Sequence, residues 1–145
     1  MRFSANLGFL WTELDLPSAV HAAAKAGFYA VELHWPYATP TTKLNAVLQE
    51  TELPVLGLNT ARGNVENGDN GLAALPGRED EAKAAIDQAI AYADAINAGA
   101  IHVMAGIAQG PEAHAQFLEN LRYATAQTAR TILIEPLNRH DAPGY

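Results

Sequence analysis

The chain has 145 residues, of which 49% are hydrophobic and 17% charged, and its formal net charge is -7. This length suits one domain, residues 1–145, or part of one, and the hydrophobic content excludes a disordered chain. The acidic balance and the scattered Lys and Arg residues argue against a nucleic-acid-binding surface. Because the chain has no cysteine, any metal would be held by oxygen or histidine nitrogen.

The amino terminus carries no charged-then-apolar leader, and the sequence starts directly with an alternating segment. No run approaches the roughly eighteen apolar residues that a membrane-spanning helix needs. We therefore expect a cytoplasmic protein that does not cross a membrane.

Strand and helix patterns alternate through the first part of the chain. Residues 2–7 show the alternation of a strand, and apolar residues then recur at helical spacing until Gly27, a carboxyl-terminal cap. A second strand is predicted at residues 29–33, a second helix at 41–50 and a third strand at 53–58. The connections are long enough for crossovers, which is typical of parallel strands.

The pattern changes after the third strand. Residues 60–76 are rich in Gly, Asn and Asp, and a loop of this length in a compact domain is usually functional. Residues 77–99 predict a helix with Ala and Ile on one stripe and acids in its first turn. A fourth strand follows at 100–104, and a further helix begins at Pro111. The inward-facing residues predicted for that helix are Phe117, Leu118, Leu121 and Ala124.

The most informative stretch is residues 131–141, where an apolar run ends in a cluster of polar residues. Residues 131–134 are apolar and largely β-branched, so we expect a short strand buried on both faces. Glu135 follows at its carboxyl end, beside the core, and Pro136 ends the strand pairing. A carboxylate at this place lies where α/β folds bind their ligands. Glu135 is therefore the leading candidate for a functional residue.

Together these elements predict an α/β fold with a parallel sheet of about five strands and four helices. A doubly wound, flavodoxin-like sheet fits the length, whereas an eightfold β/α barrel takes about 250 residues. However, no helix follows the last strand, and no glycine-rich phosphate turn follows the first. We therefore predict the amino-terminal part of a (β/α)8 TIM barrel. The short connection at residues 127–131 suggests that residues are absent there as well.

In a barrel, polar residues at the carboxyl ends of the strands converge on one mouth. Here these residues are Asn6, Glu32, His34, Asn59, His102, Glu135 and Asn138. Glu135 either has a catalytic or binding role or forms an ion pair with Arg139 or Arg2. His102 is either a ligand contact or a neutral core histidine satisfied by one hydrogen bond.

Four further residues, at three places in the chain, have two interpretations at each place. His34 and Trp35 form either a pocket wall or ordinary packing. Arg78 opposes the dipole at a helix start, so it either holds an anion or pairs with Asp80 or Glu81. Asp141 is either part of the site of Glu135 or a solvated turn residue.

Several stretches together resemble one family, the hydroxypyruvate isomerase group of the xylose-isomerase-like barrels. They are RFSANL at residues 2–7, AVE at 30–32 with PY at 36–37, GLAALPGRE at 71–79, ENLRYA at 119–124 and IEPLN at 134–138. The resemblance covers the whole chain and implies strands one to five of an eight-stranded barrel. It also implies an isomerase that interconverts hydroxypyruvate and 2-hydroxy-3-oxopropanoate (tartronate semialdehyde).

The resemblance implies roles for individual residues too. Glu135 would be both a metal ligand and the catalytic acid/base, with the remaining ligands beyond residue 145. An oxygen-liganded Mg²⁺ or Mn²⁺ suits the reaction, because a divalent ion stabilises the enediolate through which the proton moves. The partner would be a small 2-oxo acid, and a homo-oligomer is allowed. The residues expected to contact that substrate are Arg78, His102, Asn59, Asn138 and Asp141.

Three alternatives stay open. Residues 58–61 (LNTA) and 102–106 (HVMAG) resemble equally well a 2-oxo-tetronate isomerase of sugar-acid breakdown. An abasic-site endonuclease-like phosphodiesterase is another alternative, against which the net charge of -7 argues. The third is a non-catalytic half-barrel that serves as an interaction module.

Overall fold

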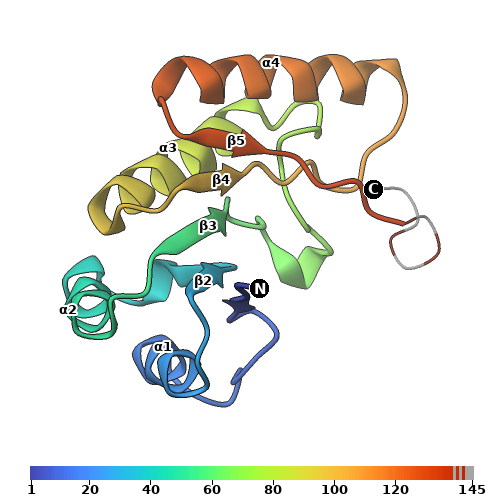
Figure 1. Cartoon of the computed structure of the whole chain (residues 1–145). Helices are drawn as coiled ribbons and strands as arrows, with labels where there is room; N and C mark the ends of the chain where they lie inside the picture. Colours follow the sequence, from blue (N-terminus) through green and yellow to red (C-terminus); the bar gives the residue numbers. More distant parts are fainter. Residues whose placement is uncertain (139, 141, 143–145) are drawn as a thin grey trace. The chain divides into compact units, whose positions relative to one another are not determined.

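The computed structural model of the protein describes residues 1–138, 140 and 142, in which strands and helices alternate (Figure 1). The strands of this part are β1 (Ser4–Asn6), β2 (Ala30–Leu33), β3 (Val55–Asn59), β4 (Ala100–His102) and β5 (Thr131–Leu133). The α-helices are α1 (Leu16–Lys25), α2 (Thr41–Thr51), α3 (Glu79–Ile96) and α4 (Pro111–Gln127). Short 3-10 helices are η1 (Pro36–Ala38) and η2 (Val65–Asn67). None of the described helices combines the length and the apolarity needed to cross a membrane.

The strands form one sheet in the order β1-β2-β3-β4-β5. β1 and β2 pair in parallel with Asn6 opposite Glu32, and β2 and β3 pair in parallel with Leu33 opposite Leu58. Neighbours in sequence are thus neighbours in the sheet, as in a β/α barrel. A flavodoxin-like sheet would have the order 2-1-3-4-5, so that alternative is excluded. The predicted fold, part of a (β/α) barrel, is confirmed.

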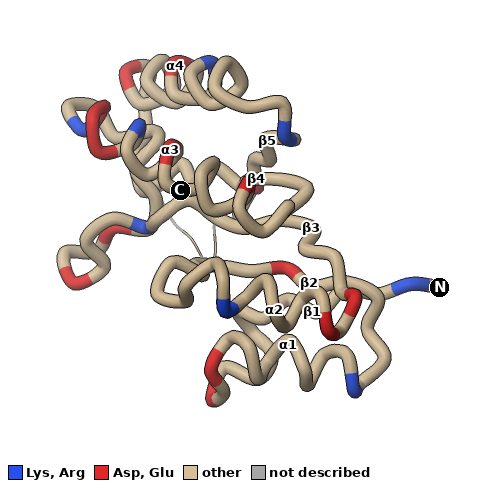
Figure 2. The backbone as a smooth tube through the Cα atoms, turned by 90° about the vertical axis from the view of Figure 1, so that its left-hand side faces the viewer, with Lys and Arg blue, Asp and Glu red and all other residues tan. Residues whose placement is uncertain are grey.

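The contacts within the chain define two compact units. Unit 1 consists of residues 1–59 and 91–100, and unit 2 of residues 60–90 and 101–145. Figure 2 shows Lys and Arg as single positions along the described backbone, without a continuous basic run.

Unit 1 has its core at β2 and at the inner faces of α1 and α2, which pack against each other (Figure 1). Val20 on α1, Val31 on β2 and Leu44 on α2 are fully buried. The start of α1 is fixed by Asp15, whose carboxylate accepts a 3.0 Å hydrogen bond from the Ser18 N–H. Hydrogen bonds from Ser18, followed by one from Lys43, lower the pKa of Asp15 to about 2.

Unit 2 packs the first part of α3 and the inner face of α4. The stripe predicted for α3 is confirmed, because Ala82, Ile86 and Ala89 are buried. The prediction for α4 is partly wrong. Leu118 is 37% exposed, whereas Asn120, which the apolar pattern did not select, is fully buried.

Strand β5 differs from its prediction. Thr131 and Leu133 are exposed, Ile132 is half-buried, and Ile134 beyond the strand is 61% exposed. The expected burial on both faces is therefore wrong. Because β5 is last in the sheet order, β4 is its one neighbouring strand among the described residues, and α4 is the helix that contacts it. An apolar run indicates burial only where both neighbours and a layer on each face are present.

Candidate active site

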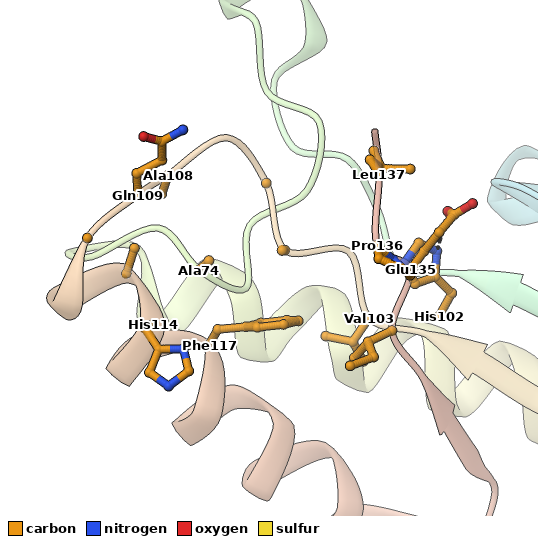
Figure 3. A pocket seen from close by; sticks show the side chains of 15 residues that line it. Ala74, His102, Val103, Ala108, Gln109, His114, Phe117, Glu135, Pro136 and Leu137 are labelled. Carbon is orange, nitrogen blue, oxygen red and sulfur yellow. Dashed lines mark ion pairs between the residues drawn. The ribbon is translucent and has the colours of Figure 1, made fainter. Parts of the chain in front are cut away.

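A pocket of about 960 Å³ lies in unit 2 at the carboxyl ends of β4 and β5, beside the first turns of α4. Figure 3 shows Glu135 and His102 next to each other in this pocket, and Phe117 on α4 pointing towards Val103. A mostly apolar pocket of this size with a few polar groups is typical of a small-molecule site. It lies at the strand ends where the sequence pattern predicted a site.

Glu135 follows β5 and lines the pocket with its side chain 61% exposed. The prediction of a carboxylate beside the core was wrong, because β5 itself is exposed. The Glu135 Oε2 lies 3.9 Å from the Nδ1 of His102. This distance is too long for a hydrogen bond but short enough for an ionic contact when the histidine is protonated. The carboxylate is therefore accessible to a ligand.

His102 is the last residue of β4, and its side chain is only 11% exposed. Buried Thr60 makes two hydrogen bonds to the end of this strand. The Thr60 N–H donates to the His102 carbonyl at 2.9 Å, and the Thr60 hydroxyl oxygen accepts from the Met104 N–H at 3.1 Å. Thr60 was not predicted, because a single Thr at the start of a loop carries no recognisable signal. These two hydrogen bonds fix the backbone that carries the imidazole beside Glu135.

Arg78 lies just before α3 and has two acidic partners, Asp69 in the preceding loop and Glu81 in the first turn of the helix. Its Nη1 donates to both carboxylate oxygens of Asp69 at 2.9 Å, and its Nη2 donates to Glu81 at 2.7 Å. Hydrogen bonds to Glu81 and Asp69 hold the pKa of Arg78 above its usual value. Burial alone would raise the pKa of Asp69, but hydrogen bonds from Arg78 and the Asn64 N–H lower it overall. The pairing with Glu81 was one of the two interpretations, and a role in substrate binding stays a prediction.

The other predicted contacts lie elsewhere in the chain or beyond its described part. The Asn138 Oδ1 accepts a 2.9 Å hydrogen bond from the His140 N–H, so this side chain caps a turn. In unit 1, the Asn59 N–H donates to the His34 carbonyl at 3.0 Å, and the Asn59 carbonyl accepts from the Tyr37 hydroxyl. Asp141 lies outside the described residues.

A second pocket, of about 250 Å³, lies in unit 1 and is lined by His34 and Trp35. The His34 ring makes edge-to-face contacts with Phe9 at 4.8 Å and with Trp35 at 4.9 Å. A Cβ at Gly8 would lie 2.0 Å from the His34 ring, so any other residue there would displace the ring. The pocket-wall interpretation of His34 and Trp35 agrees with the structure, and the two rings also pack.

Sequence reasoning did not select Gln109, His114 and Phe117 as site residues, although they also line the pocket of unit 2. Their positions depend on a loop whose glycines, Gly106 and Gly110, have φ angles of 90° and 93°. Two glycines just before a helix therefore mark a sharply bent loop. The glycine pair before α4 was therefore the signal in the sequence that could have pointed to these pocket residues.

A metal centre needs several ligands close together. In the part of the chain that the structure describes, no group of three His, Asp or Glu side chains could hold a metal ion. Glu135 and His102 form a pair, whereas Mg²⁺ and Mn²⁺ prefer about six oxygen-rich ligands. The described residues therefore do not form a metal centre by themselves.

The chain belongs to the xylose isomerase-like TIM barrels, whose family model matches residues 20–145. The similar proteins carry two different names. A protein of Xenopus laevis, provisionally named as a hydroxypyruvate isomerase, is 41% identical over 95% of this chain and 54% of its own length. A 2-oxo-tetronate isomerase of Cupriavidus necator is 41% identical over 99% of this chain and 58% of its own length. The predicted resemblance is confirmed.

Solved structures agree with the fold. A crystal structure described as AP endonuclease, family 2, from Brucella melitensis has a TM-score of 0.93 and 35% identity, over 99% of this chain and 58% of that chain. A D-allulose 3-epimerase of Methylomonas sp. has a TM-score of 0.69 at 19% identity, over 96% of this chain and 52% of that chain, and shows the fold alone. The chain thus spans about half the length of the relatives it matches.

The alignment to the Cupriavidus protein also bears on the length of the chain. It extends over 151 positions, whereas the chain has 145 residues. At least six positions, the difference between these numbers, therefore have no counterpart in the chain. Insertions in a relative produce such positions as well, so the absence of residues at 127–131 stays a prediction.

Proposed function

We propose that the protein is an isomerase that interconverts hydroxypyruvate and 2-hydroxy-3-oxopropanoate, with Glu135 as its catalytic acid/base. One observation carries the proposal: Glu135 lines a pocket at the carboxyl end of β5 with its carboxylate accessible and His102 beside it. In β/α barrels this face of the sheet carries the catalytic residues. The names of the Xenopus and Cupriavidus relatives point to the same type of reaction.

The reaction moves a carbonyl by one carbon and requires one base. The base removes a proton from the CH₂OH carbon of hydroxypyruvate, and the released electron pair forms the C=C bond of an enediolate. The proton then returns to the former carbonyl carbon, while the hydroxyl proton moves to the other oxygen and leaves an aldehyde. A positioned carboxylate can serve both transfers, and such catalysis contributes about 10² to 10⁴ in rate. Glu135 has the exposure that direct contact with a substrate carbon requires.

Of the cationic or ionisable residues expected to contact the substrate, Arg78 and His102 are the two that suit its carboxylate, and His102 is the better placed. Arg78 donates to two carboxylates and is not among the described residues that line the pocket. The Nδ1 of His102 lies 3.9 Å from Glu135 in that pocket, so both side chains can reach one bound molecule. We therefore assign substrate orientation to His102 and loop structure to Arg78.

A divalent cation, Mg²⁺ or Mn²⁺, is part of the same proposal. When bound, such an ion would stabilise the charge of the enediolate as a Lewis acid. Glu135 would supply one oxygen ligand. Since the described residues contain no group of three suitable side chains, the other ligands would come from outside them.

The nearest alternative is a 2-oxo-tetronate isomerase, which performs the same proton transfer on a longer acid. It is favoured by the Cupriavidus relative, whose identity of 41% equals that of the Xenopus relative. A pocket of about 960 Å³ accepts either acid, so its size does not discriminate between them. The name given to the Brucella protein points instead to an endonuclease, but the net charge of -7 disfavours a DNA-binding surface.

The test is the Glu135→Gln variant of the complete protein, assayed with both acids in parallel. We expect kcat/KM to fall about 10²- to 10⁴-fold, because the amide cannot accept the proton. The thermal midpoint should not change, because the side chain is exposed. Glu112→Gln, at an exposed acid on α4 outside the pocket, is the matched control. Near-normal turnover in Glu135→Gln would refute the assignment, and the preferred acid in the wild type would decide between the two isomerases.

A further inference from the structure

The wall of the unit 2 pocket is supported by the segment 71–75, which we call the strap. The Ala73 N–H donates to the Met104 carbonyl at 3.2 Å, and the Ala74 N–H donates to the Ala105 carbonyl at 2.7 Å. Ala74 and Ala105 both line the pocket. The strap is therefore paired through its backbone with the segment that leaves β4.

Asn120 contacts the strap from α4. Its side chain is fully buried, and its Nδ2 donates to the Ala73 carbonyl at 2.8 Å. The strap is thus fixed on both sides. The N–H groups of Ala73 and Ala74 donate to the segment after β4, and the Ala73 carbonyl accepts from α4. Of the three bonds, the one from Asn120 is the one that depends on a side chain.

The identity of Asn120 is unfavourable for stability alone. Its Oδ1 is buried and has no hydrogen-bond partner among the described residues. A buried acceptor without a partner destabilises the folded state, and Asn is a poor helix former. Leucine has a similar size and would avoid both disadvantages, but it would leave the Ala73 carbonyl without this donor. The position thus keeps a residue whose benefit is the bond to Ala73.

We propose that Asn120 is a positioning residue of the candidate active site. It holds the strap on the segment after β4 and so fixes one wall of the pocket that His102 and Glu135 also line. The catalytic consequence rests on the proposed function, whereas the effect on the strap does not.

The direct test is amide hydrogen exchange in the full chain, comparing wild type with Asn120→Leu. We expect exchange at Ala73 and Ala74 to accelerate at least about tenfold, since the strap then opens locally, while α4 keeps its protection. Tyr123→Phe is the matched control, because it removes a 2.9 Å hydrogen bond from α4 to Asp87 and leaves the strap untouched. If Asn120→Leu fails to fold, Asn120→Ser, which is too short to reach Ala73, replaces it.

Two exchange results would overturn the proposal. If Ala73 and Ala74 exchange as slowly in Asn120→Leu as in the wild type, Asn120 does not hold the strap. A uniform acceleration over α4 and the strap would show that Asn120 merely stabilises the fold. These results do not depend on which substrate the protein uses, so they separate a failure of this proposal from a failure of the proposed function.

Kinetics provide the second readout in the complete enzyme, with hydroxypyruvate as the probe. A loosened pocket wall should raise KM about tenfold and leave kcat within about twofold, because the wall contacts the substrate and the base is unchanged. An unchanged KM alongside accelerated strap exchange would overturn the catalytic part of the proposal.

Discussion

Glu32 and Glu135 both lie towards the carboxyl ends of strands, one in each unit, and their surroundings differ. In unit 1, the Glu32 carboxylate accepts a hydrogen bond from the Ser4 hydroxyl of the neighbouring strand. In unit 2, the Glu135 carboxylate is 61% exposed in a pocket, and the His102 ring lies 3.9 Å away. One acid has a structural partner, whereas the other is accessible to a ligand.

The two units also hold their strand ends by different means. In unit 1 side chains do so, as the hydrogen bonds from Ser4 to Glu32 and from Tyr37 to Asn59 show. In unit 2 the backbone of the strap pairs with the segment after β4, and the side chains of Thr60 and Asn120 add one hydrogen bond each. A scaffold built from backbone groups leaves side chains available for chemistry. The candidate active site is placed in unit 2 because Glu135 and His102 both line its pocket.

The largest effect is expected where the backbone scaffold of unit 2 is broken. Gly106 has a φ of 90°, and a Cβ there would lie 2.3 Å from the Gly71 carbonyl oxygen. Gly106→Ala should therefore lower the free energy of unfolding by at least about 3 kcal/mol, through backbone strain and a clash with the strap. Urea unfolding monitored by circular dichroism measures this change.

Gly68→Ala is the matched control for this prediction. Gly68 also has a φ of 90°, but a Cβ there would meet nothing within 4 Å. This variant should lower the free energy of unfolding by only about 1 kcal/mol, the cost of the backbone conformation alone. Equal losses in the two variants would mean that the strap does not lie against Gly106.

A smaller effect is expected where the side-chain scaffold of unit 1 is broken. Ser4→Ala removes a hydrogen bond to a partly buried carboxylate and should lower the free energy of unfolding by about 1 to 2 kcal/mol. A double-mutant cycle with Glu32→Leu, which has no acceptor, should show that most of this loss belongs to the pair. Thr125→Ala, which removes an exposed hydroxyl bonded to its own helix, is the control and should change the value by less than about 0.5 kcal/mol. Additive losses in the cycle would contradict the structural role given to Glu32.

The sequence predicted the order of elements because strand and helix periods alternate clearly, and it located the stripe that includes Ala82 and Ile86. It also selected Glu135 and His102, which share one pocket. It failed for β5, because an apolar run does not reveal whether a neighbouring strand is present. It also failed for Asn120, because a polar residue in a helix is normally exposed.

The partners of charged groups were the second weakness of the sequence analysis. Arg78 was expected to bind an anion or to pair within its own helix, and its pairing with Asp69 depends on the path of the long loop. Contacts across loops are set by backbone conformations such as those at Gly63 and Gly71. Periodicity does not describe such conformations, so these contacts required the structure.

The smallest effect concerns Asp15, a cap at the surface of unit 1, and it depends on pH. Hydrogen bonds from Ser18, and then from Lys43, lower the pKa of Asp15 from 3.8 to about 2. A lowered pKa means that the ionised cap stabilises the folded state fully above about pH 4 and that this contribution disappears as the pH falls towards about 2. The thermal midpoint of Asp15→Ala should therefore lie below that of the wild type at about pH 5, and the gap should close near about pH 2.

Lys43→Met separates the two causes, because it keeps the 3.0 Å bond from Ser18 and removes the exposed ion pair. Added salt should weaken the contribution of Lys43 but not that of Ser18. If salt at about pH 5 abolishes the difference in thermal midpoint between the wild type and Asp15→Ala, the ion pair and not the cap carries the effect.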